Sequence, residues 1–521
     1  MPGFDLHIKQ GHLSWPKKKN TQMKYFITIL LALSIFSQGF AQSLQDAIRL
    51  SGSSFYSSAR SSGVGGAFGA MGADFGSISY NPAATGAYWG GEFSVGVSLN
   101  SSLTQARLDG NGTDMFDKYS KRKFKFDQIG YIINTQPIGS DWKSASFGFG
   151  MNRIANFDQK MYYEGNTKGS FTDRFLERSH GKELSELDDF EGGLAYDVGA
   201  IYGPDNNLYY ASDYQKFGPN NLLHKSQSID LRGGINEMLF SYGANYNDVF
   251  LFGLNVGIPF VNYSETKSYT EEALDVSSVL KKLNYDEYLQ TSGVGINFKG
   301  GMILKMSKYF RLGASFHSPT YYSLEDDYST NMMYAYDEGD GLKSGEKESP
   351  GAYFKYKFSS PWRYTGSLGA IYKLGDLNGF IDFDVEYADF STGKFDFTAY
   401  SSDEGDALNQ QEQNERIREE LKASLTYRMG AELAYKKLRM RGGIALPDTP
   451  FEKDDLSDVI PTYTLGAGIR GDKVFIDFAF IREGTRYGYS PYILIDETLI
   501  QPFVDVEKFT SKWLVTFGTR F

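Results

Sequence analysis

The chain has 521 residues, a formal net charge of −11 and no cysteine. The lack of cysteine excludes disulfide frameworks, zinc–thiolate sites, cysteine nucleophiles and a lipid anchor on an N-terminal cysteine. An acidic chain is a poor partner for nucleic acid, so no nucleic-acid partner is expected. Aromatic residues make up 16% of the chain and glycine occurs 57 times, a composition typical of an exported protein built from strands.

Residues 23–41 carry the features of a secretory signal peptide. A lysine is followed by an apolar run that ends at Phe36, and Gly39 and Ala41 occupy the small-residue positions of a cleavage site. The apolar run is too short to span a membrane comfortably. Residues 1–22 are then an over-called start or an unusually long n-region.

The segment 42–90 is rich in glycine and small residues and precedes the first regular strand, which is expected to start near Gly91. Glycine allows close packing and unusual backbone angles, and an Asn-Pro pair favours a turn. The segment is therefore interpreted as a compact unit that turns sharply before the first strand. Its candidate residues, three glycines and a turn triplet, are Gly63, Gly65, Gly66, Asn81, Pro82 and Ala83.

Alternation of apolar and polar residues recurs along residues 91–521. In the segment 250–258 aromatic and aliphatic residues alternate with glycine and asparagine, with Leu251 the one exception. In the segment 474–480 the one exception is Phe475. The apolar face is almost wholly aromatic or aliphatic, whereas the polar face mixes small residues with charges. This pattern favours a transmembrane barrel with a polar lumen over a soluble sandwich.

Tight turns alternate with long links between these segments, which is typical of an outer-membrane barrel. The fold class predicted is all-β, an antiparallel barrel of fourteen strands, and a closed barrel satisfies every backbone group in lipid. The predicted strands cover residues 91–103, 123–136, 143–157, 237–246, 249–263, 293–306, 309–327, 356–374, 379–390, 421–436, 438–447, 461–470, 473–482 and 508–521. Within the long links, helical spacing predicts helices over 270–289 and 405–422.

Residues suited to catalysis or metal binding do not form a recognisable set. His317 precedes Ser318, but neighbours on a strand point to opposite faces, which disfavours a Ser-His hydrolase and leaves His317 as a polar lumen residue. The acidic run 337–341 lacks the spacing of an EF-hand and is interpreted as an acidic loop. No enzyme activity, metal or cofactor is predicted. The inward charges expected to form ion pairs are Asp382, Asp384, Glu386, Arg428, Glu432, Arg439 and Arg441.

Several motifs resemble, in family order, those of the FadL/TodX (OmpP1) family of outer-membrane transporters for long-chain fatty acids and aromatic hydrocarbons. The first is ARSSGVGGAFGAMGADFGSISYNPAATG, which holds the Asn-Pro-Ala triplet of the family. The others are FRLGASFHSPTYY, SPWRYTGSLGAIY, YRMGAELAYKKLRMRGGIALPDTPF, YTLGAGI and TFGTRF. The terminal Phe521 also resembles the signal that the barrel assembly machinery recognises.

The resemblance implies a Gram-negative outer-membrane barrel, in contact with outer-membrane lipid, whose lumen is plugged by an N-terminal hatch, here residues 42–90. It implies passive uptake of a hydrophobic small molecule, a fatty acid or detergent-like compound, which leaves sideways through a kink in the third strand. Carried over to this chain, the kink falls at Asn152, Asn156 and Phe157.

Two other functions are weighed against transport. Barrels that resemble this family also handle cargo in type IX protein secretion, and the long link between residues 157 and 237 keeps that alternative open. An outer-membrane lipase is disfavoured because the histidines offer no suitable pairing.

Overall fold

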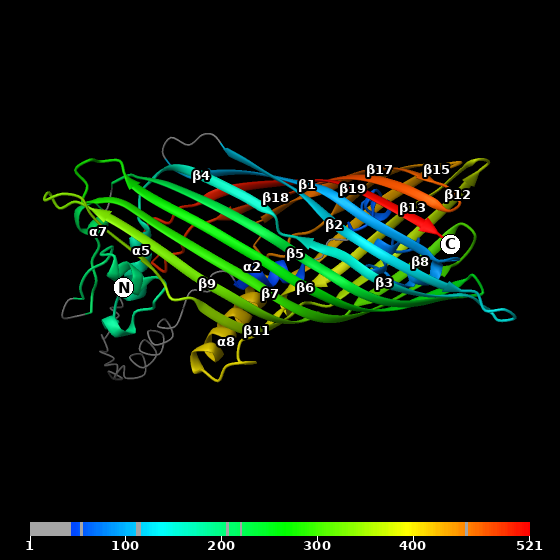
Figure 1. The fold of residues 1–521 in the computed structure, drawn as a ribbon, viewed down its shortest axis with the longest axis horizontal. Coiled ribbons are helices and arrows are strands. Elements are labelled where there is room, and N and C mark those ends of the chain that lie inside the picture. The colour runs from blue at the N-terminus through cyan, green and yellow to red at the C-terminus, as the bar shows by residue number, and fades with distance from the viewer. Residues whose placement is uncertain are drawn as a thin grey trace, which may run out of the picture.

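The strands of the chain form a single sheet that closes on itself into a barrel. The computed structural model describes residues 43–52, 56–110, 116–204, 208–218, 221–453, 457–496 and 498–521. The predicted signal peptide and residues 1–22 lie outside the described residues. None of the helices within those ranges is long and apolar enough to cross a membrane. The long strands run obliquely around the axis (Figure 1).

Nineteen strands make up this sheet. They are β1 Glu92–Leu108, β2 Asp117–Thr135, β3 Trp142–Asn156, β4 Gln159–Thr167, β5 Leu223–Tyr246, β6 Phe250–Ala273, β7 Leu280–Lys305, β8 Phe310–His317, β9 Tyr321–Tyr336, β10 Lys343–Glu348, β11 Ala352–Ser359, β12 Arg363–Leu374, β13 Leu377–Asp389, β14 Lys394–Asp396, β15 Ala423–Tyr435, β16 Leu438–Leu446, β17 Ser457–Arg470, β18 Val474–Tyr489 and β19 Val504–Arg520.

The barrel wall has fourteen antiparallel positions, so the predicted fold class and strand count are confirmed. Four positions are each filled by two strands in line, β3 with β4, β8 with β9, β12 with β11 and β13 with β14. β10 only extends the hairpin of β9. Closure is made by β1, which pairs with β19 along its whole length, from Glu92 opposite Arg520 to Leu108 opposite Val504.

The apolar faces of the strands point outward, as predicted for a membrane barrel. Leu254, Phe298, Phe383 and Trp513 are all exposed on the outside, whereas polar neighbours such as Asp382 are fully buried inside. Lipid replaces water as the environment of such an outer surface, and a closed barrel leaves no strand edge in it. The chain is therefore a multi-pass transmembrane β-barrel of the outer-membrane type.

The predicted helix over 270–289 is wrong. These residues form the end of β6, a turn and the start of β7. The spacing of Ala273, Leu280 and Leu283 is that of one inner face of a hairpin, where they pack on an apolar cluster, while Val276 lies exposed in the turn. Pairing of two long strands outweighs local helical spacing here. The helix predicted over 405–422 is confirmed as α8 Glu404–Glu420.

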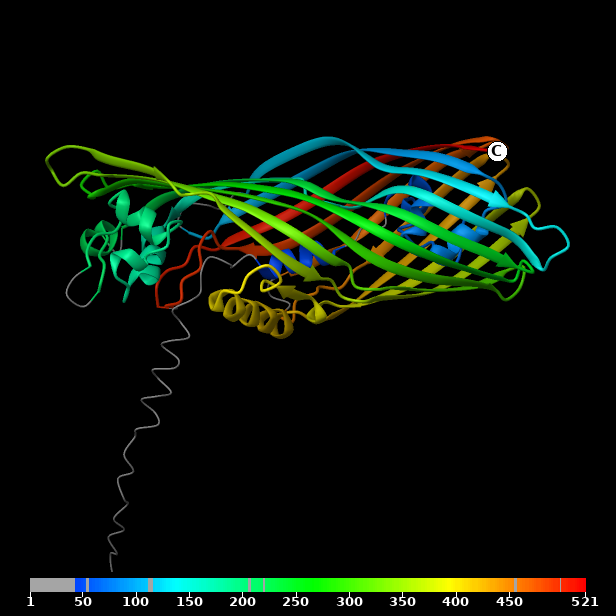
Figure 2. The same ribbon diagram turned by 60° about the horizontal axis from the view of Figure 1, so that its bottom comes forward.

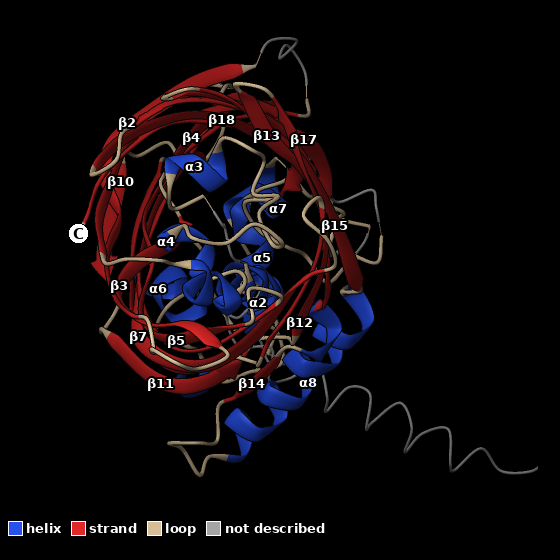
Figure 3. Ribbon diagram, turned by 90° about the vertical axis from the view of Figure 1, so that its right-hand side faces the viewer, coloured by secondary structure: helices blue, strands red, loops and turns tan. Residues whose placement is uncertain are grey.

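The helices form three groups, and in the end-on view those of the first two fall within the outline of the ring of strands (Figure 3). The N-terminal group is α2 Ser43–Ser51, α3 Ala59–Ser62, α4 Phe75–Ile78 and the 3-10 helix η1 Pro82–Ala87. The group between β4 and β5 is α5 Phe171–Ser179, η2 Leu184–Glu186, α6 Gly192–Asp197 and α7 Asp213–Phe217. The third, η3 Phe390–Thr392 and α8, lies against the outside of the wall near β14.

The group between β4 and β5 caps one end of the barrel, opposite the end that holds the short turns and the C-terminus (Figure 2). Phe171, Phe175 and Leu176 pack on the inner faces of the extended strands, against Tyr269 and Tyr285. The carboxylate of Glu271 anchors α5 by accepting hydrogen bonds from Ser170 Oγ at 2.7 Å and from the Phe171 amide at 2.9 Å. The link that was predicted to be a long loop is therefore a folded cap.

Candidate functional site

The N-terminal segment 56–90 fills the lumen at the end that holds the short turns. Its backbone is held by inward side chains of the wall: the amides of Phe68 and Gly69 donate to Asp384 Oδ2 at 3.0 and 3.2 Å, and the Gly65 amide donates to Thr464 Oγ1 at 2.8 Å. Because these bonds run from backbone to wall, they fix the path of the segment rather than one side chain.

The predicted hatch residues lie within this segment. Gly65 and Gly66 have φ of +71° and +75°, a left-handed conformation that favours glycine. A Cβ added at Gly63 would lie 3.2 Å from the Cα of Gly466 on the wall. Ala83 is fully buried against Leu251 of β6 and Ile303 of β7, so the apolar exception in the β6 pattern is explained by contact with the segment.

The triplet Asn81-Pro82-Ala83 starts η1. Asn81 Oδ1 accepts from the Ala83 amide at 3.1 Å, and Pro82 occupies the first turn, where a missing amide proton costs nothing. Asn81 Nδ2 also donates to the carbonyl of Gly69 at 2.7 Å, which ties η1 to the glycine-rich run.

We expect Asn81→Ala to disturb this segment more than Pro82→Ala. The first change removes the cap and the bond to Gly69, at a cost of about 1–2 kcal/mol, whereas the second removes only a preset φ angle. Single-channel recordings in planar bilayers should show a clear rise in leak conductance for Asn81→Ala and a smaller one for Pro82→Ala. Equal conductance of both variants and wild type would show that the triplet is merely a turn.

Buried charges brace the lumen. Arg428 Nη1 lies 3.2 Å from Glu386 Oε2, and it donates to the hydroxyl of Tyr80 at 3.1 Å, so an ion pair of the wall also holds the segment. Arg441 joins Glu432 at 2.6 Å and Asp477 at 2.8 Å. The predicted inward ion pairs are therefore present for these residues. Three of the predicted residues differ. Arg439 donates to the carbonyls of Lys436 and Leu438 at a turn, and Asp382 and Asp384 accept hydrogen bonds from amides of the N-terminal segment instead of forming ion pairs with described residues.

His317 is a polar lumen residue, as predicted. Its Nε2 lies 2.8 Å from the carbonyl oxygen of Tyr80, where it braces the N-terminal segment. Ser318 faces the other way, and its Oγ accepts from the Phe298 amide and donates to the Pro319 carbonyl. The two side chains therefore do not form a nucleophile–base pair.

The third strand position is interrupted at residues 157–158, between β3 and β4. Asn152 is the last residue of β3 that pairs with β2, and its side chain is buried and donates to Ser79 Oγ at 2.9 Å. Asn156 ends the strand. The Phe157 amide still reaches the Gly233 carbonyl at 3.2 Å, and the Phe157 ring lies 5.7 Å from that of Tyr263. Of the three residues of the predicted kink, Asn156 and Phe157 thus lie at this interruption, whereas Asn152 lies four residues before the end of β3, where its pairing with β2 stops.

A cavity of about 310 Å³ lies directly behind the interruption. Its apolar lining comes from the N-terminal helix, β3 and β18, and its charged lining includes Arg153, Lys512 and Glu483. The lining residues are Ile48, Arg49, Gly52, Tyr56, Asn100, Arg153, Ile154, Ala155, Asn156, Phe157, Ile481, Glu483, Thr510 and Lys512. We call this the apolar chamber.

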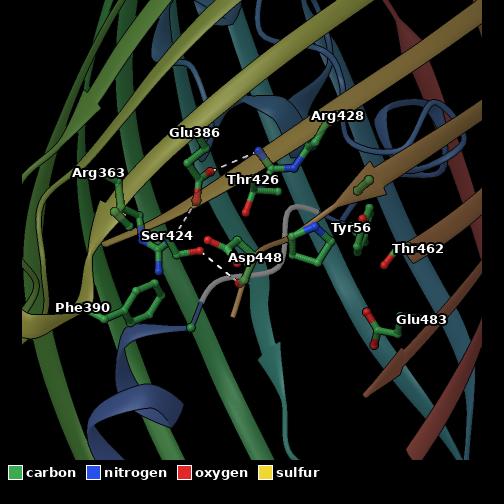
Figure 4. Close-up of a pocket in the computed structure, with 14 residues that line it drawn as sticks. Tyr56, Arg363, Glu386, Phe390, Ser424, Thr426, Arg428, Asp448, Thr462 and Glu483 are labelled. Carbon is green, nitrogen blue, oxygen red and sulfur yellow. Dashed lines mark hydrogen bonds and ion pairs between the residues drawn. The ribbon is translucent and has the colours of Figure 1, made fainter. Parts of the chain in front are cut away.

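A second cavity of about 230 Å³ shares Gly52, Tyr56 and Glu483 with the apolar chamber, so the two lie side by side. Its walls are more polar: Glu386 lies between Arg363 and Arg428, and hydroxyl groups surround them (Figure 4). Both arginines form ion pairs with Glu386.

Fold and lumen together define a plugged transmembrane barrel with a side-wall interruption. No model of a protein family matches the chain, and no curated protein matches it either. Among solved structures, the toluene transporter TodX of P. putida covers 91% of this chain and 99% of its own at 13% identity, with a TM-score of 0.51. The fold of the chain is thus the fold of TodX, and the resemblance to the FadL/TodX family is confirmed at the level of the fold.

Two further solved structures are similar over most of the chain. A FadL homologue of Pseudomonas aeruginosa covers 89% of this chain and 98% of its own at 13% identity, with a TM-score of 0.49. The toluene transporter TbuX of Ralstonia pickettii matches over 91% of this chain and 100% of its own chain at 15% identity, with a TM-score of 0.46.

Several residues at the interruption were not predicted. They are the charges that face it, Asp158 within the break and a row of lysines on β2. The sequence could have indicated this group of charges. Lys121, Lys123 and Lys125 alternate with residues that include the outward Phe124 and Phe126, so three cations face inward within five residues of one strand.

Proposed function

We propose that the protein is an outer-membrane channel for passive uptake of hydrophobic small molecules, which leave the barrel sideways at the interruption between β3 and β4. The observation that carries the proposal is the position of the apolar chamber, which adjoins this interruption and holds both residues of the predicted kink that end the strand, Asn156 and Phe157.

The plug supports a sideways rather than an axial path. Residues 56–90 are almost entirely buried among wall residues, from Ala59 on Thr516 to Thr85 on Ser241. A molecule that follows the axis would have to displace this hatch and then enter water. An alkyl chain gains about 0.8 kcal/mol for each CH₂ group buried, so an exit toward lipid keeps that gain.

The charge of the chamber supports a fatty acid rather than an aromatic hydrocarbon as the ligand. Arg153 and Lys512 line it together with the apolar side chains of Ile154 and Ile481. Glu483 also lines the chamber, but three cations, Arg49, Arg153 and Lys512, outnumber this one carboxylate. An apolar cavity with an excess of cations fits a chain that ends in a carboxylate, because charged groups fix the orientation of a ligand held by apolar contacts.

We expect Ala155→Trp to abolish ligand binding without unfolding the barrel. Ala155 lines the chamber, and an indole placed there would occupy much of its volume of about 310 Å³. Titration of purified protein with a fluorescent long-chain fatty acid should show saturable binding for wild type and for Ala155→Ser, and none for Ala155→Trp. A wild type that binds no fatty acid or alkyl aromatic, or a tryptophan variant that binds as tightly as wild type, would contradict the proposal.

The cargo-handling role in type IX secretion gains no support from the residues that the structure describes. The long link that kept that alternative open folds back as a cap on its own barrel.

A further inference from the structure

Two irregularities of neighbouring strands face each other beside the apolar chamber. Gly96 of β1 pairs with Gln128 and Val97 pairs with Phe126, so Asp127 is the extra residue of a bulge. At the same place β2 stops pairing with β3, because the last pair is Gln128 with Asn152. Residues 117–127 of β2 therefore run on with no backbone ladder on that side to any strand that the structure describes.

Ion pairs span this unladdered edge on the inside. Lys125 Nζ lies 2.6 Å and Lys123 Nζ 3.5 Å from the carboxylate of Asp158, which is 4% exposed and belongs to the break between β3 and β4. Lys121 reaches over the break to β5, where it pairs with Asp230 and donates to the Leu231 carbonyl at 2.7 Å.

Further along β2, on the face that the three lysines share, side chains also reach β4. The rings of Tyr119 and Tyr162 lie 5.5 Å apart, and Asp117 Oδ2 accepts from the Glu164 amide at 3.2 Å. The wall between β2 and β4 is therefore a seam of side-chain contacts. Such contacts exchange partners more readily than a ladder of backbone hydrogen bonds, and ion pairs among them respond to competing ions.

Cations continue from the seam to the chamber. Asp127 pairs with Lys512 at 2.8 Å and lies 3.9 Å from Arg153, and both cations line the chamber. Lys508, the preceding inward lysine of β19, interacts electrostatically with Asp158 and Glu483 but has no ion pair or hydrogen bond to any described residue. An anion that leaves the chamber thus meets a row of ammonium groups that ends at Asp158.

We propose that Asp158 is a built-in carboxylate that latches the seam, and that the anionic head group of the ligand replaces it on Lys123 and Lys125, which opens the wall. This inference rests on the proposed function, since it assigns the opening step to the ligand itself. A ligand shifts an equilibrium only by its different affinity for the two states. One carboxylate replaces another here, so the lysines stay paired while Asp158 moves into water, whereas a neutral ligand offers them nothing.

The first test compares laurate with dodecanol, which share a chain length and differ in charge. In Asp158→Asn the lysines lose their internal partner, so laurate should bind about tenfold more tightly than to wild type, the change expected when one buried competing charge is removed. Dodecanol binding should not change, and Asp158→Glu should behave as wild type. The latch is refuted if both ligands gain equally or if laurate binding is unaltered.

The second test locks the seam. The chain has no natural cysteine, so Lys125→Cys with Asp158→Cys can be joined by a short bis-methanethiosulfonate and released by reductant. The locked protein should bind laurate but fail to pass it from the chamber into liposome lipid, and reduction should restore transfer. The matched control is Thr291→Cys with Asp326→Cys, a hydrogen-bonded pair on the continuously laddered strands β7 and β9, which should pass laurate whether locked or not.

Transfer by the locked seam at the rate of the reduced protein would overturn the latch while leaving the proposed function intact. Failure of wild type to bind or transfer laurate at all would instead remove the proposed function, and the latch with it. The two failures are therefore distinguishable in one set of samples.

Discussion

Lys299→Met should destabilise the barrel by about 3–5 kcal/mol, the loss found when one partner of a buried ion pair is removed. Lys299 Nζ donates to both oxygens of Glu237, at 2.7 and 2.6 Å, and the Glu237 side chain is fully buried. Without the ammonium group, Glu237 keeps only neutral donors, Ser79 Oγ at 3.0 Å and Asn297 Nδ2 at 3.0 Å. Urea unfolding of the protein in lipid vesicles, followed by tryptophan fluorescence, measures the change.

The matched control is the double variant Lys299→Met with Glu237→Gln. Glutamine keeps the shape of the side chain and can still accept from Ser79, so most of the lost stability should return, because replacing a whole buried pair is often nearly neutral. A double variant as unstable as Lys299→Met would show that the lysine acts through packing rather than charge. Since Ser79 belongs to the hatch, the single variant should also raise leak conductance.

Gly443→Ala should displace the hatch from its contacts with the wall, so the barrel should become permeable to small solutes. A Cβ at this position would lie 2.1 Å from the carbonyl carbon of Val64 and 2.3 Å from the Gly65 nitrogen, and backbone atoms cannot move aside as a flexible side chain can. Overpacking of this kind costs about 1–3 kcal/mol, so the population with a displaced hatch should rise about 5- to 150-fold. Single-channel recordings and the entry of a small sugar into proteoliposomes measure the leak.

Gly442→Ala is the matched control for this variant. The two glycines are neighbours on β16, but Gly442 faces outward, where the nearest atom to an added Cβ is a Leu465 methyl group at 4.0 Å. Its conductance should equal that of wild type. Equal leak from both variants would mean that β16 itself is disturbed, and no leak from Gly443→Ala would mean that the hatch tolerates the added methyl group.

Lys299→Met and Gly443→Ala both test how the barrel wall holds the hatch, the first through a buried charge and the second through close backbone packing. Glycines of the wall, such as Gly253, Gly430 and Gly443, face the backbone of the hatch, where a Cβ would come within 2.0–2.1 Å. Close approach allows wall side chains such as Asp384 and Thr464 to reach hatch amides directly. The hatch is therefore held by many short polar contacts over a small-residue surface, together with buried ion pairs from the wall.

Local patterns account for the barrel. Alternation along β6 and β13 predicts which face contacts lipid, and tight turns such as that at residues 246–248 predict which strands are neighbours. Strand number and fold class therefore follow from residues close together in the chain. The exceptions in the pattern were equally informative once seen in place: Leu251 packs on the hatch, and Phe475 lies 4.4 Å beneath the guanidinium of Arg470.

Patterns failed where a residue's partner is distant in the chain. At the capped end of the barrel the outward faces of the strands are polar, and apolar residues such as Tyr269 and Leu283 face inward. The alternation with apolar residues outside therefore stops there, so it did not predict the extension of β5 back to Leu223 or the hairpin that replaced a predicted helix. The family resemblance placed the kink near Asn156, but Asp158 and its partners on β2 and β5 could not be connected, because their meeting depends on where β2 bulges and β3 stops.

Fold class, outward and inward faces and a compact glycine-rich segment before the first strand were thus predictable from the chain, since each depends on neighbours a few residues apart. That this segment plugs the lumen was implied only by the family resemblance. The chamber, the seam and the hatch contacts arise between residues as far apart in the chain as Ala59 and Thr516, which are 457 positions apart. Closure of the barrel brings those residues together. The alternation along the strands requires that the barrel close, but it does not indicate which distant residues then come into contact.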